Sequence, residues 1–345
     1  INYTNVCYFK CQFCAFSKGK LSENLRGRPY DISAEEIARR CQEAWGRGAT
    51  EVCMQGGIHP DYTGQTYLDI VDTVRQAVPD MHIHAFSPLE VWQGASTLGI
   101  SLKHYLQRLQ AAGLNTLPGT AAEILHDDVR ELICPDKLNS QQWLQVMETA
   151  HDLGFRTTAT IMYGHVDKPV HWATHLLKIR ELQSRSGGFT EFVPLPYVHM
   201  EAPMYLKGKS RKGPSFREAI LMHAVARLVF HELIPNIQAS WVKMGMEGVI
   251  ACLNAGANDL GGTLMNESIT RAAGASYGEE WAPQAIEESI RKMARLPRMR
   301  NTLYADAPEE RRRSAMAAGK LRAIENSSAG KKQRDKRVDN LTRVV

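Results

Sequence analysis

Residues 33–54 read Ser-Ala-Glu-Glu-Ile-Ala-Arg-Arg-Cys-Gln-Glu-Ala-Trp-Gly-Arg-Gly-Ala-Thr-Glu-Val-Cys-Met, and they contain the unit from which the fold is built. Ser33 and Glu36 have the spacing of a capping box, which predicts that a helix begins here. Apolar residues then recur at helical spacing as far as Trp45. Gly48 suits the left-handed conformation that often follows a helix. Residues 51–54 are apolar enough for a short strand.

The same order of helix, glycine and strand recurs at Gly113, Gly154 and Gly256. Adding the remaining apolar segments gives eight candidate strands, at residues 2–6, 51–54, 82–86, 115–117, 157–162, 191–193, 236–240 and 258–260. Eight alternating βα units predict a (β/α)8 TIM-type barrel. A further helix at residues 281–295 predicts a C-terminal helical extension. We expect one catalytic domain over residues 1–304 and a basic, mobile tail over residues 305–345.

The first predicted strand leads into Cys7-Tyr8-Phe9-Lys10-Cys11-Gln12-Phe13-Cys14, a C-x3-C-x2-C pattern without a fourth cysteine nearby. Closed zinc sites and ordinary four-cysteine clusters need a fourth protein ligand. Three thiolates on a 4Fe–4S cluster leave one iron open to a small molecule. The spacing and the aromatic residue before Cys14 resemble the cluster loop of the radical S-adenosylmethionine (SAM) superfamily. The alternatives are a zinc knuckle with a distant histidine and three unrelated core cysteines.

Composition narrows the class of protein. The chain has 345 residues, of which 43% are hydrophobic and 23% charged, and no long apolar run, so we expect no membrane span. Residues 309–345 hold 11 Lys or Arg against 5 Asp or Glu, which accounts for the net charge of +5. This terminal stretch lacks stacking aromatics, so we expect no nucleic-acid partner. We predict a cytoplasmic enzyme, and because Ile1 is not an initiator methionine, an upstream or fused segment is expected.

Polar residues cluster where the barrel strands end, which is where barrel enzymes place their active sites. In the radical SAM superfamily a glycine-rich stretch after the second strand contacts SAM, and Gly56 and Gly57 occupy that place here. The residues expected to bind the cofactor are Phe13, Gln55, Gly56, Gly57, Ser87, Glu90, Thr120 and Glu123. For Ser87 and Glu90 the alternative is a helix cap with an exposed carboxylate.

Later strand ends supply candidates for the chemistry itself. The residues expected to be catalytic are Tyr163, His165, Glu201, Lys243 and Asp259. Those expected to bind substrate are His59, His84, His199, Gln238, Asn266 and Glu267.

Three segments resemble one branch of the superfamily, the tyrosine-using half of FO synthases, over residues 1 to about 304. They are residues 2–7, residues 84–92 and the run Gly256-Ala257-Asn258-Asp259-Leu260-Gly261-Gly262-Thr263-Leu264-Met265-Asn266-Glu267. The resemblance implies that Cys7, Cys11 and Cys14 hold the 4Fe–4S cluster and that SAM binds its open iron.

The implied reaction begins when reduced cluster and SAM give a 5′-deoxyadenosyl radical that takes hydrogen from L-tyrosine. The tyrosine Cα–Cβ bond breaks, 2-iminoacetate is released, and the 4-hydroxybenzyl group joins 5-amino-6-(D-ribitylamino)uracil. Implied partners are these two substrates, a low-potential electron donor, and a second radical SAM subunit or fused domain. Two alternatives stay open: a radical SAM enzyme of the futalosine route to menaquinone, and a noncatalytic metal-binding barrel.

Overall fold

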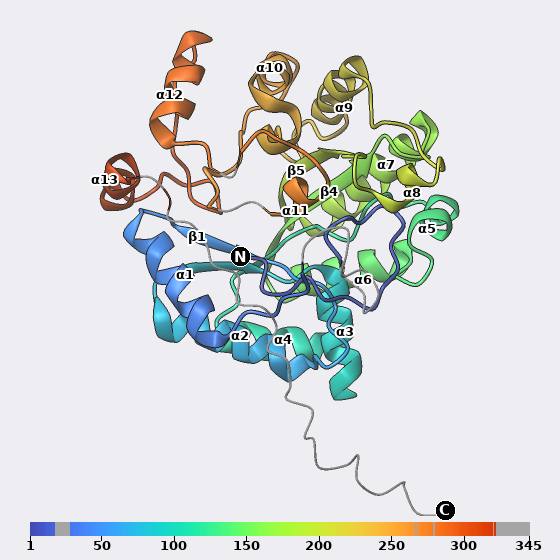
Figure 1. The fold of residues 1–345 in the computed structure, drawn as a ribbon, viewed down its shortest axis with the longest axis vertical. Helices are drawn as coiled ribbons and strands as arrows, with labels where there is room; N and C mark the ends of the chain where they lie inside the picture. Colours follow the sequence, from blue (N-terminus) through green and yellow to red (C-terminus); the bar gives the residue numbers. More distant parts are fainter. Residues whose placement is uncertain (18–27, 266–267, 279, 320, 322–345) are drawn as a thin grey trace, which may run out of the picture.

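A computed structural model describes residues 1–17, 28–265, 268–278, 280–319 and 321. At its centre lies a six-stranded parallel sheet in which each strand pairs with the next along the chain (Figure 1). The strands are β1 (Glu51–Met54), β2 (His82–Ala85), β3 (Thr116–Leu117), β4 (Arg156–Tyr163), β5 (Phe189–Pro196) and β6 (Asn236–Ile237). Parallel bridges extend this order at both ends, from Asn2 to Gln55 and from Gln238 to Asp259. These eight positions match the eight predicted strands, and the (β/α)8 prediction is confirmed, with the first and last strands reduced to single bridges.

Helices surround the strands in Figure 1, and those between strands make the parallel crossovers. The helices up to β4 are α1 (Ala34–Gly46), α2 (Gly64–Ala77), α3 (Pro88–Leu98), α4 (Leu102–Ala112), α5 (Asp127–Ile133) and α6 (Ser140–Asp152). Those that follow are α7 (Pro169–Ser186), α8 (Pro203–Leu206), α9 (Phe216–Val229), α10 (Trp241–Asn254), α11 (Ile269–Ala272), α12 (Pro283–Lys292) and α13 (Glu309–Ala317). The predicted C-terminal helical extension corresponds to α12.

The first helix begins at the predicted residue. Ser33 accepts a hydrogen bond from the Glu36 backbone N–H at 3.3 Å. The Glu36 carboxylate, however, does not complete a capping box, because it binds Arg39 and Arg40 at 2.7 Å each. Charge-assisted bonds to a guanidinium are stronger than a bond to a neutral backbone amide, which explains the difference.

Part of the predicted tail is folded against the barrel. The helix α13 places the Arg311 guanidinium 3.9 Å from the centre of the Trp45 ring. Arg311 also donates a hydrogen bond to the Trp45 carbonyl at 2.7 Å. A Cβ at Gly48 would lie 2.3 Å from the Arg311 carbonyl oxygen, so this glycine allows the close approach of α13. The described structure therefore continues past residue 304, where the sequence had placed the end of the domain.

Alternation along the strands separates the helix-facing core from the barrel interior. Val52 and Met54 of β1 are buried in the core cluster that includes helices α1 and α2, so the intervening Cys53 faces inward. Cys53 is nevertheless exposed. Because its two neighbours are buried, solvent reaches Cys53 from the inner side of the sheet.

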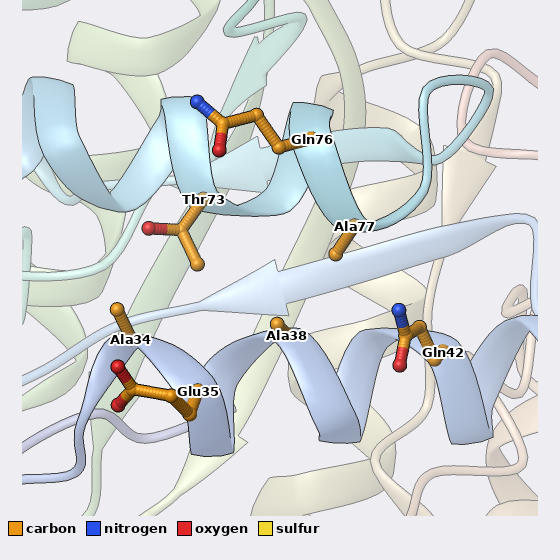
Figure 2. A pocket seen from close by; sticks show the side chains of 7 residues that line it. All are labelled: Ala34, Glu35, Ala38, Gln42, Thr73, Gln76 and Ala77. Atoms are coloured by element: carbon orange, nitrogen blue, oxygen red, sulfur yellow. The ribbon is translucent and has the colours of Figure 1, made fainter.

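A shallow surface groove runs between α1 and α2 (Figure 2). Its lining residues are short or polar: Ala34, Glu35, Ala38, Gln42, Thr73, Gln76 and Ala77. It shares no residue with the predicted site. In the part of the chain that the structure describes, no helix is long and apolar enough to span a lipid bilayer.

Candidate radical SAM active site

The cluster loop, residues 7–14, is held at several points by segments distant in sequence. Backbone bonds run from Tyr8 N to Ile58 O (3.1 Å), from Gln12 N to Ile133 O (2.8 Å) and from Met204 N to Gln12 O (2.8 Å). Lys10 N also donates to the Asp136 carboxylate at 2.9 Å. The loop after β1, the turn after α5 and the start of α8 thus fix one short loop.

The three cysteines of this loop fit an iron–sulfur cluster. Each is partly exposed, as a ligand must be if it is to meet a cluster outside the packed core. Soft thiolates are the donors that iron–sulfur clusters require. The Ser17 backbone N–H points at Cys14 Sγ, at 3.3 Å, and such hydrogen bonds to sulfur tune cluster potential. Burial raises the pKa of the Cys11 and Cys14 thiols, which makes nearby positive charge valuable for ligation.

The glycine pair after β1 lies directly against the first segment of the chain. A Cβ at Gly56 would lie 2.2 Å from the Tyr3 ring, and one at Gly57 would lie 2.3 Å from the Val6 carbonyl oxygen. Gly57 N–H donates to Thr4 O at 2.8 Å. These glycines therefore let two backbones approach beside the cluster loop. Their predicted contact with SAM, and that of the half-buried Gln55, stay predictions.

Ser87 and Glu90 form a helix cap. Ser87 is the N-cap of α3 and its side chain accepts from Glu90 N–H, while the Glu90 carboxylate accepts from Ser87 N–H at 2.6 Å. The carboxylate is only 1% exposed, and it also accepts from Tyr3 OH and from Gly56 N–H. Burial raises its pKa. The helix-cap alternative had placed this carboxylate in solvent, and the structure corrects that expectation. Glu90 caps α3 and also binds the glycine pair and the first segment of the chain, so both carboxylate oxygens accept hydrogen bonds.

A buried ion pair lies beside the cluster loop. Lys137 Nζ is 2.7 Å from Glu123 Oε1 and 5.5 Å from the centre of the Phe13 ring. Both charged side chains are largely buried, at 7% and 12% exposure. Thr120 adds a buried hydroxyl that has no hydrogen-bond partner among the described residues. Phe13, Thr120 and Glu123 thus remain candidates for cofactor contact.

Lys137 is a functional candidate that sequence reasoning missed. It lies in the turn between α5 and α6, far along the chain from the cysteines and not at a strand end. The Cys-Pro-Asp-Lys run at residues 134–137 marks only a turn. Its position beside Phe13 depends on a tertiary contact that no local pattern encodes.

Two of the predicted catalytic residues lie in packed structure instead of the barrel interior. Tyr163 is fully buried in the helix-facing core, with its ring 5.5 Å from that of Trp172 on α7. His165 is 1% exposed, and its Nδ1 accepts from Val166 N–H at 2.8 Å beside the carboxylate of Asp167. Burial lowers the pKa of His165. These side chains stabilise the turn after β4, and the expectation that they face the cavity is corrected.

Other predicted residues do face the interior. His84, Gln238 and Asp259 alternate with core residues, so their side chains point to the inner side of the strands. His84 Nδ1 lies 2.7 Å from the Thr116 hydroxyl, and burial lowers the His84 pKa. A neutral imidazole paired with a hydroxyl suits binding of a polar substrate.

Gln238 and Asp259 belong to an interior network with three residues that were not among the candidates. Glu191 is the hub of this network. The network bonds are Gln238 Nε2 to Glu191 (3.0 Å), Tyr304 OH to Glu191 (2.5 Å) and Arg300 Nε to Asp259 (2.5 Å). Arg300 also lies 3.5 Å from Glu191 and 4.1 Å from the centre of the Tyr304 ring. Burial raises the pKa of Glu191 to about 7. Asp259 is therefore already paired, and its predicted catalytic role lacks a free carboxylate.

The remaining candidates stay predictions. His59 stacks on Tyr62 at 5.0 Å and accepts from Asp61 N–H, and His199 packs edge-on against Tyr205 at 4.4 Å. Glu201 is exposed in the turn after β5, and Lys243 lies in the first turn of α10. Asn266 and Glu267 lie outside the described residues.

Comparison with known proteins identifies the class. Residues 1–177 match the family described as the radical SAM superfamily, and residues 186–312 match the CofH/MqnC C-terminal region. The chain belongs to the radical SAM superfamily. A 4Fe–4S cluster and SAM are the cofactors of that superfamily, so the cofactor prediction is confirmed.

Two curated relatives are more specific. The chain is 50% identical over 315 residues to an FO synthase of Streptomyces coelicolor, covering 91% of this chain but 36% of that protein. It is 48% identical over 304 residues to the 5-amino-6-(D-ribitylamino)uracil–L-tyrosine 4-hydroxyphenyl transferase of Methanopyrus kandleri, covering 88% of this chain and 81% of that one. The chain thus spans about a third of the length of the FO synthases it matches. The predicted resemblance is confirmed.

Solved structures support the fold alone. The crystal structure of methylornithine synthase (PylB) is similar with a TM-score of 0.64 at 17% identity, covering 86% of this chain and 81% of that one. The FeFe-hydrogenase maturase HydG from Carboxydothermus hydrogenoformans gives the same TM-score at 14% identity, covering 88% and 67%.

Proposed function

We propose that this chain transfers the 4-hydroxybenzyl group of L-tyrosine to 5-amino-6-(D-ribitylamino)uracil, with release of 2-iminoacetate, in FO biosynthesis. The observation that carries the proposal is the 48% identity to the Methanopyrus kandleri transferase, which extends over 81% of that protein. The cysteine loop, the exposed Cys53 on the inner side of the sheet and the polar inner face of the strands are consistent with it.

The residues of the chain have separable tasks in this proposal. Cys7, Cys11 and Cys14 would hold the cluster, and Thr120 and Phe13 would contact SAM. Cluster and SAM supply a 5′-deoxyadenosyl radical when bound. The barrel interior would exclude bulk water from that radical and orient two polar substrates through His84 and neighbouring groups.

Partners and context complete the proposal. The FO synthases are longer than this chain, which covers 36% of one of them, and this extra length is consistent with a second radical SAM unit, fused or separate, that closes the deazaflavin ring. A low-potential donor must reduce the cluster. All seven cysteines are free thiols, which suits a reducing cytoplasm. Residues 1–304 would form the catalytic unit.

The test is an anaerobic assay of reconstituted protein with dithionite, SAM, tyrosine and the ribitylaminouracil, followed by mass spectrometry. The proposal expects 5′-deoxyadenosine and a hydroxybenzyl–pyrimidine adduct, both lost in Cys14→Ala and both kept in the matched control Cys134→Ala. Deoxyadenosine without adduct would reject the substrates but keep the class.

A second candidate function needs a separate assay, because the family that matches the C-terminal part of the chain covers both CofH and MqnC proteins. A product formed only with a co-substrate of the futalosine route would favour that branch. About four irons per chain without any SAM cleavage would instead indicate a noncatalytic barrel.

A further inference from the structure

The structure places one lysine where its charge can act on the cluster ligands. The Lys137 side chain is 7% exposed, and its ammonium lies 5.5 Å from the ring of Phe13, the residue directly before Cys14. Burying a charge is costly unless it has a partner, and Glu123 supplies that partner at 2.7 Å. The position of this lysine is therefore specified by the fold.

Backbone hydrogen bonds fix both members of the pair. Lys137 N–H donates to Cys134 O at 3.1 Å, and Glu123 O accepts from Met162 N–H at 2.9 Å. The turn that carries Lys137 also holds the cluster loop, through Ile133 O and the Asp136 carboxylate. Because these contacts hold the turn against the cluster loop, the ammonium is held in a defined place beside that loop.

We propose that Lys137 is a positioning residue that supplies fixed positive charge to the iron–sulfur cluster, favouring the reduced state of the cluster. One-electron reduction, by dithionite or a low-potential protein donor, adds one negative charge to the cluster and no proton. A nearby buried cation stabilises that added charge, because screening is weak in the interior. Glu123 orients the ammonium and offsets part of its field.

We expect the charge of Lys137 to outweigh that of Glu123 at the cluster, because the ammonium lies against the ring of Phe13 in the cluster loop itself.

The test is a potentiometric titration of the reconstituted cluster, followed by electron paramagnetic resonance without SAM. It compares the unaltered protein with Lys137→Met, Lys137→Arg and the neutral double variant Glu123→Gln/Lys137→Met. Lys137→Met should make the reduction equilibrium about tenfold less favourable, which is 59 mV for one electron. The double variant should shift in the same direction by less, and Lys137→Arg should stay close to the unaltered protein.

The double variant guards against a folding artefact, since Lys137→Met alone leaves Glu123 buried without its partner. A loaded cluster with an unchanged potential in either neutral variant would overturn the proposal. Failure of folded neutral variants to bind iron, while Lys137→Arg binds it, would support the proposal, because binding of the cluster would then depend on the positive charge. Loss of iron from Lys137→Arg as well would show that shape matters and charge does not, and would also overturn it.

Discussion

Gly57→Ala should displace the backbone that packs against the start of the cluster loop. The new Cβ would lie 2.3 Å from the Val6 carbonyl oxygen and 3.0 Å from Cys7 Cβ. Both neighbours belong to a segment tied down by backbone bonds, including Gly57 N to Thr4 O, so neither can rotate away as a flexible side chain would. Relief requires a shift of about 1 Å in the backbone next to a cluster ligand, and overpacking of this kind costs about 1–3 kcal/mol.

The assay for Gly57→Ala combines thermal unfolding of the metal-free protein with iron content after reconstitution. We expect a lower unfolding temperature and fewer than the normal number of irons. Gly46→Ala is the matched control, because a Cβ there meets nothing within 4 Å and helical alanine is favoured over glycine by about 1 kcal/mol. A Gly57→Ala protein with the stability and iron content of the control would refute the steric argument.

Three further predictions concern other parts of the molecule. Cys134→Ala should keep about four irons per chain and Cys14→Ala should lose them, measured by iron and sulfide analysis, because Cys134 is 1% exposed and lies outside the ligand loop. Native Glu191, with its pKa raised to about 7, holds a proton that the unfolded chain releases near pH 4.5. The free energy of unfolding should therefore fall as pH rises from about 4.5 to 7, and Glu191→Gln should weaken this dependence in denaturant titrations; an unchanged profile would contradict the assignment. Arg311→Ala removes the contact with the Trp45 ring and the hydrogen bond to the Trp45 carbonyl, so it should lower the free energy of unfolding by about 1–2 kcal/mol and expose α13 to proteolysis. If the variant resists proteolysis as well as the wild-type protein does, α13 is held by other contacts.

The sequence specified the barrel because its signals are local and repeated. Helix starts such as Ser33 and helix ends such as Gly113, whose φ is +111°, depend on residues a few positions apart. The count of eight strands followed from this repetition, and the candidate ligand cysteines were recognised by their spacing. The first and last predicted strands form only single bridges in the structure, and the sequence revealed them only through the same repetition.

The interior was predicted less well, because position at a strand end does not say which way a side chain points. Tyr163 ends β4 but faces the helices, whereas Glu191, three residues into β5, faces inward. Arg300 reaches Asp259 and Glu191 from beyond the last helix of the barrel proper. Glu191 meets Arg300 and Tyr304, which lie more than a hundred residues later in the chain. No periodic pattern in the sequence predicts such contacts.

The anchoring of the cluster loop also sets an order for the protein's biogenesis. The cysteines at positions 7, 11 and 14 leave the ribosome before Ile133 and Met204, whose carbonyl and N–H hold this loop. Contacts so distant in sequence form slowly, since a long chain must first close on itself. The loop therefore gains its full set of anchors only after residue 204 has emerged. We accordingly expect stable insertion of iron and sulfide to follow the assembly of the elements up to α8.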